Sequence, residues 1–435
     1  MNPGRVSDMR EGTWIGPITA GLAVIVLAVP LVGQTTIELP ERDRALDTDF
    51  EDVYRVGSFD GDLWETFGEI AGLSFDAAGN LFILDRQASR VTVVDPSGSF
   101  LRAIGQPGDG PGEFRMPVAF TAMPSGGLVV ADLGHRSYQL FDAGGSFERM
   151  VSMGGGDMIR VGEIAPHSSG TAVVSGGGGM AIAMRSGPGG GPSRPETRPI
   201  EVISLTGDVA ETETIVEAWQ PPRDDRPQRL EGGGVRIQMS MAGPRTFEPE
   251  LLVGALRDGG VAYADSSTYR IRIVGSDGRV RRELTRDHRP REVTNRMRRA
   301  ERDRRLDELE EGEGPRMRIL TSNGSGGGIP ISDEAMRDIM RGQIEQLQFY
   351  PELPVLMDLK STWRGRIWAQ RRGDAPTEPG AIDVMTPEGR YEGTFPAGSI
   401  RMPAAFGPDG LTAWIERDEF DVPTIVVKRL PADLN

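Results

Sequence analysis

The chain has 435 residues, a formal net charge of −15 at pH 7 and no cysteine. The acidic balance argues against a nucleic-acid-binding protein, because phosphate recognition depends on a basic surface. The absence of cysteine excludes disulfides, thiolate metal sites and a cysteine nucleophile. The 58 glycines and 32 prolines favour many short strands and turns over long helices.

The first residues have the order of an export signal. Arg5 and Arg10 precede an uncharged run, residues 12–37, and a basic region followed by a short apolar core is typical of a secretory signal peptide. An uncleaved anchor over residues 13–33 is the alternative, because the apolar stretch is just long enough to span a bilayer. Both interpretations of residues 1–33 place the rest of the chain in the periplasm or outside the cell. Under the second, it stays anchored to the inner membrane.

Residues 34–52 are acidic and aperiodic, which predicts a linker. The strand candidate at residues 53–59 has no partner nearby in the sequence. A terminal strand often completes the last blade of a closed β-propeller and so removes an exposed edge. We therefore expect this strand to pair with the C-terminal strands.

Residues 75–147 contain two similar units, each of three short apolar strands joined by glycine-rich turns. Such a unit cannot bury both faces alone and must stack on further copies. The repeats are indexed by six turn glycines: Gly79, Gly126, Gly170, Gly259, Gly365 and Gly410. Three of the five intervals fit the roughly 40–50 residues of a four-stranded blade. The sequence thus predicts an all-β fold, a six-bladed β-propeller of four-stranded antiparallel blades over residues 53–435.

Acidic residues recur six positions after four of these glycines, as Asp85, Asp132, Asp265 and Glu416. An arginine follows three of them, as Arg90, Arg136 and Arg270. A short Asp side chain can cap the backbone of a tight turn, and an arginine can hold it by a charge-assisted bond. We interpret these pairs as structural.

Three insertions interrupt the repeats, at residues 175–193, 220–247 and 288–350. The first is dominated by glycine, which predicts a flexible loop. The third contains the helix-forming sequences, residues 292–309 and an amphipathic segment after Ser332, so we predict a helical insertion between blades 4 and 5. The strand order of a blade places all three insertions on one face of the propeller.

Two stretches resemble known propellers. The run GDGPGEF at residues 108–114, followed by Asp132, His135 and the strand YQLF, resembles an NHL-type repeat. The C-terminal segments PELPVL, GRIWAQ and DVPTIVVKRL are similar to the closing blades of exported bacterial six-bladed β-propellers. The resemblance implies a propeller in an exported protein and implies no particular activity.

The chemistry of related propeller enzymes has little support in the sequence. Calcium-dependent lactonases hold their ion with channel carboxylates and Asn side chains, whereas the predicted innermost strands here offer only Glu163 and Asp358 as acids. A zinc site with three histidines is excluded, because His135 and His288 are expected on the insertion face and His167 on the opposite one. We predict no catalytic residue, no metal and no cofactor.

The insertion-bearing face is therefore the predicted working surface. It includes an arginine-rich segment, residues 279–305, with twelve arginines against five acids. We interpret this segment either as a solvated helix or as a patch for an acidic partner. The candidate binding residues on this face are Asp109, Glu113, Arg115, His135, Arg296, Arg299, Arg302, Met336 and Met340.

The predicted function is an exported binding or scaffold propeller that engages a protein or another ligand through the insertion-bearing face. A protein of the cell envelope is the expected partner; nucleic acid is excluded, and the membrane is contacted only through the N-terminal segment. A metal-dependent hydrolase or lyase with a site in the channel is one alternative. A membrane-anchored accessory subunit of an envelope complex is the other.

Overall fold

The computed structural model describes the following residues: 34–58, 61–154, 158–183, 196–222, 228–232, 235–239, 244–311, 333–417 and 422–435. The predicted signal peptide or anchor, residues 1–33, lies outside them. Within these ranges, no helix is both long and apolar enough to cross a membrane.

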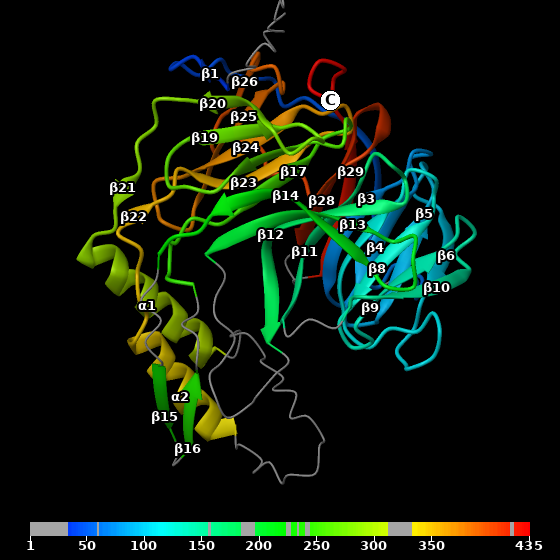
Figure 1. Ribbon diagram of the computed structural model, residues 1–435, viewed down its shortest axis with the longest axis horizontal. Helices are drawn as coiled ribbons and strands as arrows, with labels where there is room; N and C mark the ends of the chain where they lie inside the picture. The colour runs from blue at the N-terminus through cyan, green and yellow to red at the C-terminus, as the bar shows by residue number, and fades with distance from the viewer. Residues whose placement is uncertain are drawn as a thin grey trace, which may run out of the picture. The chain divides into compact units, whose positions relative to one another are not determined.

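Six antiparallel sheets, the blades, make up most of the fold (Figure 1). Blade 1 comprises β3 (Ile70–Phe75), β4 (Leu81–Asp85), β5 (Arg90–Val94) and β6 (Phe100–Ile104). Blade 2 comprises β7 (Pro117–Ala122), β8 (Leu128–Asp132), β9 (Ser137–Phe141) and β10 (Phe147–Ser152). Blade 3 comprises β11 (Met158–Pro166), β12 (Ala172–Ala183), β13 (Thr197–Ser204) and β14 (Glu211–Trp219).

The second half of the chain forms the other three blades. Blade 4 comprises β17 (Leu252–Ala255), β18 (Val261–Ala264), β19 (Arg270–Val274) and β20 (Val280–Thr285). Blade 5 comprises β23 (Leu356–Ser361), β24 (Ile367–Arg372), β25 (Pro379–Met385) and β26 (Tyr391–Phe395). Blade 6 comprises β27 (Ala405–Phe406), β28 (Leu411–Arg417), β29 (Pro423–Arg429) and the N-terminal β2 (Glu51–Val56), with the 3₁₀ turn η1 (Pro408–Gly410) before β28.

The prediction that an N-terminal strand completes the last blade is confirmed, because β2 pairs antiparallel with β29. The linker prediction for residues 34–52 is wrong in part. Residues Thr35–Glu38 form β1, which pairs in parallel with β20 as a fifth strand of blade 4, and Leu39 is buried. Four residues are too few to show a period, and the partner strand lies about 250 residues away.

The flexible-loop prediction for residues 175–193 is also wrong in part. Strand β12 continues through the glycines to Ala183, with Gly176 opposite Glu163 and Met180 opposite Val161 of β11. Glycine carries no side chain that could show an alternating pattern, but its backbone groups still join the hydrogen-bond ladder that β11 offers. Residues 184–195 lie outside the described residues.

Between β20 and β23 the chain forms α1 (Asn295–Glu310) and α2 (Asp333–Glu345). Thr294 caps α1, and its side-chain oxygen accepts from the backbone N–H of Met297 at 3.3 Å. Two small sheets accompany the helices: β15 (Gln228–Gly232) with β16 (Val235–Met239), and β21 (Arg291–Glu292) with β22 (Glu352–Leu353). The helix α2 contacts both α1 and β15, and Figure 1 shows these elements gathered on one side of the blades.

The apolar core is divided among the blade interfaces. Phe82 and Leu84 of blade 1, for example, pack in one buried cluster with Phe120 and Leu128 of blade 2. A cluster of this kind joins each neighbouring pair of blades, including blade 6 with blade 1. The blades therefore close on themselves, and each buries both of its faces against neighbours.

The repeated acids hold the segments that enter the blades. Asp85 accepts from the backbone N–H groups of Gly68 and Glu69 at 3.0 and 3.2 Å, and Asp132 accepts from Arg115 and Met116, both at 2.9 Å. Both acids also accept from the turn that follows them. The capping role predicted for these two side chains is confirmed.

The arginine partners predicted for these acids are wrong. Arg90 donates to the carbonyl oxygens of Leu63, Trp64 and Thr66 instead of pairing with its Asp. In blade 4 the residue that pairs with Asp265 is Arg272, at 2.9 Å. Arg270 lies opposite Thr285 of the neighbouring strand β20 and pairs diagonally with Glu283, at 3.3 Å.

A buried ionic network joins blades 4 and 5 to the N-terminal segment. The side chain of Arg286 is fully buried and donates to Asp383 at 2.7 Å and to Asp43 at 2.8 Å. Asp383, also fully buried, accepts a further hydrogen bond from Thr394. Arg371 donates to the other oxygen of Asp43 at 2.7 Å. Burial alone would raise the pKa of Asp43, but Arg371 and Arg286 bring the pKa below its ordinary value.

We expect Arg286→Met to lower the free energy of unfolding by about 3–5 kcal/mol, because the buried carboxylate of Asp383 loses its 2.7 Å ion pair and keeps only the longer one to Arg371, at 3.5 Å. Urea denaturation followed by tryptophan fluorescence measures this loss. The control is Arg282→Met on β20, the strand that ends just before Arg286. Arg282 makes no ion pair in the described structure, so this change should alter stability by less than about 0.5 kcal/mol. Equal losses in the two variants would contradict the assignment.

Candidate functional site

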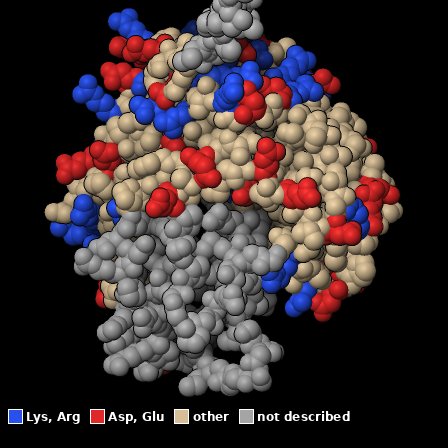
Figure 2. All heavy atoms as spheres, viewed as in Figure 1, with Lys and Arg blue, Asp and Glu red and all other residues tan. Residues whose placement is uncertain are grey.

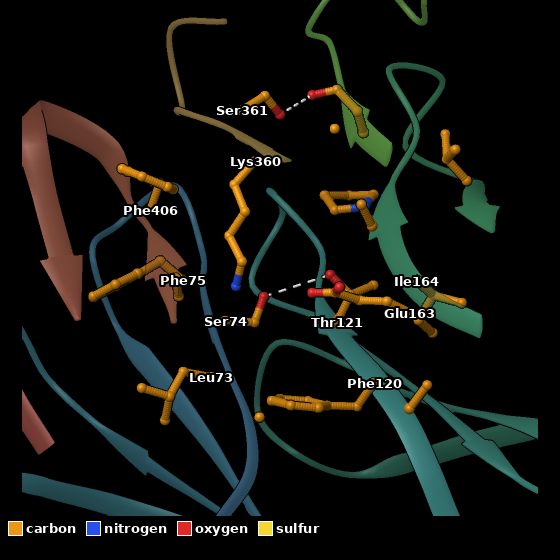
Figure 3. A pocket seen from close by; sticks show the side chains of 18 of the residues that line it. Leu73, Ser74, Phe75, Phe120, Thr121, Glu163, Ile164, Lys360, Ser361 and Phe406 are labelled. Atoms are coloured by element: carbon orange, nitrogen blue, oxygen red, sulfur yellow. Dashed lines mark hydrogen bonds between the residues drawn. The ribbon is translucent and has the colours of Figure 1, made fainter. Parts of the chain in front are cut away.

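The innermost strands of the six blades surround a central channel with a cavity of about 990 Å³ (Figure 3). These strands are β3, β7, β11, β17, β23 and β27, and they match the innermost strands expected from the sequence. Strands of neighbouring blades approach closely at some channel positions. A Cβ at Gly254 would lie 3.1 Å from the backbone nitrogen of Ser361, so glycine allows the close approach of blade 4 to blade 5 there.

Polar side chains from four blades meet in the channel. Figure 3 shows Lys360 of β23, Ser74 of β3, Thr121 of β7 and Glu163 of β11 all facing the same space. The Ser74 and Thr121 hydroxyls lie 3.4 Å apart, and the Lys360 ammonium donates to the carbonyl oxygen of Ala404 at 3.1 Å. Lys360 thus reaches across to blade 6 from blade 5.

The rest of the channel wall is largely apolar. Leu73 and Phe120 lie on one side of the polar group, while Phe75 and Phe406 flank it on another (Figure 3). Apolar walls with a few convergent polar groups are the usual composition of a small-molecule site. The channel can therefore contact both a charged group and an apolar body of one ligand.

Asp358 stands two residues before Lys360 on the same strand and is half-buried. Burial raises the pKa of its carboxyl, and the Glu163 carboxylate adds to this effect, while the Lys360 ammonium opposes it. Its Oδ1 accepts from the N–H of Leu359 at 2.7 Å.

The three histidines occupy separate places. His135 Nδ1 lies 2.8 Å from the Asp132 carboxylate, His288 Nε2 lies 2.8 Å from Arg371, and His167 Nδ1 lies 3.1 Å from the Ser169 hydroxyl. Among the described residues, no group of three or more histidine and acidic side chains is arranged to hold a metal ion. His167 lines the channel mouth, in the turn between β11 and β12.

The predicted binding residues of blade 2 form a structured loop. Asp109 pairs with Arg115 at 3.0 Å, and both side chains are exposed. Glu113 accepts from the N–H of Gly110 and from Gln106, and these bonds lower the pKa of its carboxyl. His135 is nearly buried, and its Nε2 has no hydrogen-bond partner in the described structure. The structure brings these four residues together. The hydrogen bonds of Glu113 and His135 are made to groups of the protein itself, Gly110 and Gln106 for Glu113 and Asp132 for His135.

The predicted binding residues of the helices have different environments. Arg296 and Arg299 are exposed on α1, and neither makes an ion pair or a side-chain hydrogen bond within the described ranges. Arg302 is half-buried; it donates to the Leu347 carbonyl at 3.2 Å and lies over the Phe349 ring, so it ties α1 to the segment after α2. Met340 is half-buried on α2, and the side chain of Met336 lies outside the described residues.

Much of the arginine-rich segment, residues 279–305, serves the fold. Arg286 is buried in the network between blades, Arg291 donates to two backbone carbonyls, and Arg304 and Arg305 both pair with the buried Glu301. Basic and acidic side chains are interspersed over the face shown in Figure 2. The described part of the arginine-rich segment therefore does not form a continuous basic patch.

Sequence reasoning missed Lys360. The sequence predicts only two charged groups on the innermost strands, the acids Glu163 and Asp358. A signal was present, because Asp358 and Lys360 alternate around Leu359 and must therefore share a face of the strand.

Asp358→Asn should make the protein more stable than the parent at neutral pH. A raised native pKa means that the native state holds this proton more tightly than the unfolded chain, so the parent loses stability as pH rises through the interval between the ordinary value of 3.8 and the native pKa. The advantage of the variant should vanish below that interval. Urea denaturation at a series of pH values gives the curve. As a control, Lys360→Met should raise the Asp358 pKa further, measured by carboxyl NMR; an unchanged value would contradict the coupling.

The comparisons with known proteins agree with the fold. A family model, DUF5128, described as a 6-bladed beta-propeller, matches residues 66–149, which contain blade 1 and most of blade 2. No curated protein matches the chain. The match is to a general six-bladed propeller model and not to the NHL repeat that residues 108–141 resemble. The class defined by the family match and by the six four-stranded blades is the six-bladed β-propeller.

Several solved structures are similar at low identity. A protein described as exported, from Bacteroides fragilis, is 11% identical with a TM-score of 0.45, and the alignment covers 91% of this chain and 100% of that one. A member of the duf4221 family from Bacteroides vulgatus is 9% identical with a TM-score of 0.47, covering 88% and 99%. A streptogramin B lyase is 9% identical with a TM-score of 0.37, covering 85% and 100%.

Proposed function

We propose that this six-bladed propeller is a binding protein that holds a small organic ligand in its central channel. The observation that supports this function is the cavity of about 990 Å³, in which polar groups converge between apolar walls. Sites for small molecules typically measure about 300–1,000 Å³ and have this composition. The channel is proposed in addition to the working surface predicted on the insertion-bearing face, which remains a second candidate. A metal-dependent hydrolase or lyase gains no observation in its favour from the described residues.

A large side chain introduced into the channel should prevent ligands from binding there. Ala255 of β17 and Ala404 beside β27 both line the cavity and are half-buried, so Ala255→Trp and Ala404→Trp place an indole in it from two different blades. Saturation-transfer NMR against a small-molecule fragment library measures binding. Hits seen with the parent should disappear with both variants.

The matched control is Leu63→Trp, because Leu63 is 88% exposed on the surface and away from the cavity lining. The Leu63→Trp variant should bind the same fragments as the parent protein. Thermal melting of all three variants shows whether they fold. A parent without hits, or hits that survive both channel variants, would refute the channel as the binding site.

A second candidate function uses the insertion-bearing face. Arg296 and Arg299 lie one turn apart on α1, exposed and without an ion pair in the described structure, although the chain as a whole is acidic. Unpaired arginines on one helix face favour an acidic protein surface as partner. We propose an envelope protein as this partner, with residues 1–33 exporting the chain to the periplasm or beyond, or anchoring it to the inner membrane as an accessory subunit.

Reversal of both charges, Arg296→Glu with Arg299→Glu, should reduce partner capture at least about fivefold, because attraction between the two surfaces becomes repulsion. Quantitative pull-down from envelope extract, with cytoplasmic extract beside it, measures the change. Arg401→Glu, which reverses an exposed charge near blade 6, is the control and should leave capture intact. Equal capture by the parent and the α1 variant, or equal capture from both extracts, would argue against this role.

A further inference from the structure

Two side chains of opposite charge face the channel from blades that are not neighbours. Glu163 belongs to blade 3 and Lys360 to blade 5, with blade 4 between them. Both line the cavity, and Figure 3 shows them reaching into it from different strands. The channel therefore carries a negative and a positive group at separate places on its wall.

Neither group is neutralised by an ion pair within the described part of the chain. The Lys360 ammonium donates to one carbonyl oxygen, that of Ala404 at 3.1 Å, although it has three protons to donate. Asp358 on the same strand makes no ion pair with it, and its Oδ1 accepts from the neighbouring Leu359 N–H. Glu163 is exposed to the channel and has no protein donor in the described structure. Both groups keep hydrogen-bonding capacity for a ligand.

The surroundings of the two charges define the rest of the ligand. The aromatic rings of Phe75, Phe120 and Phe406 line the same cavity, as do the hydroxyls of Ser74 and Thr121 (Figure 3). An aromatic wall favours an apolar body that leaves water on binding. A free inorganic ion or a sugar without charge would use only part of this lining.

We propose that the channel binds a zwitterionic small molecule with an apolar body, an amino acid or a short peptide, whose carboxylate contacts Lys360 and whose ammonium contacts Glu163. This inference rests on the proposed channel site and names the class of its ligand. The two charges of such a molecule complement the two charges of the channel wall. A ligand with one charge alone leaves one of the two protein groups unpaired. The cavity is large enough for either an amino acid or a short peptide.

Isothermal titration calorimetry with four probes tests the proposal: phenylalanine, the dipeptide phenylalanyl-phenylalanine, N-acetylphenylalanine and phenylalaninamide. The zwitterions should bind, and loss of either charge should weaken binding about fivefold or more. Tighter binding of the dipeptide than of phenylalanine would identify a peptide as the ligand. The reverse order would identify a free amino acid.

Two variants assign each charge to its partner. Lys360→Met should weaken the binding of phenylalanine about fivefold but leave the affinity for phenylalaninamide unchanged, because phenylalaninamide has no carboxylate to contact Lys360. Glu163→Gln should likewise weaken the binding of phenylalanine but leave the affinity for N-acetylphenylalanine unchanged, because that probe has no ammonium. Glu163→Gln keeps the length of the side chain and Lys360→Met shortens it by one atom, and the melting temperatures of both variants test whether the fold is intact.

The inference is overturned if none of the four probes binds, or if affinity is indifferent to the charges of the probe and of the variants. The proposed channel function fails separately. If fragments bind in the parent and are lost on filling the channel with tryptophan, while zwitterions show no preference, the channel site stands and the ligand class is wrong.

Discussion

The structure depends on the closure of six blades that each have two apolar faces. Every interface between neighbouring blades contains its own buried cluster, so no blade can bury its faces unless both neighbours are present. The pairing of β2 with β29 completes this closure, because it joins the N-terminal part of the chain to its C-terminal strands in one sheet. Closure also removes the exposed edges that an open array of sheets would leave.

The channel is a consequence of this arrangement. Six inner strands must approach one central space, and small residues such as Gly254 allow the backbones to come close there. The space that remains is lined by whichever side chains alternate inward on these strands. Charged residues at such positions destabilise the fold unless they are paired or hydrogen-bonded, since burial weakens their hydration. The raised pKa of Asp358 is a direct sign of that cost.

Polar contacts fix the blades relative to their connections. Asp85 and Asp132 accept backbone N–H groups from the segments that lead into their own blades, and Arg286 joins blade 4, blade 5 and the N-terminal segment. These contacts satisfy buried backbone and charged groups at positions where the chain leaves the regular strands. The insertions are held by similar means, since the backbone of Thr246 pairs with that of Gln348 and Phe247 packs on Phe349.

Local sequence determined the repeating part of this protein. Alternating apolar residues and turn glycines predicted the strands, the number of blades and the inner strands, because these features depend on neighbours within about 50 residues. Tertiary structure alone decided which distant groups meet. The pairing of β1 with β20, the partners of Arg286 and the meeting of Lys360 and Glu163 in one cavity join residues about 100–250 positions apart, and no local period records such contacts. The strands could therefore be read from the sequence, whereas the candidate ligand site emerged only when six of them closed around a common channel.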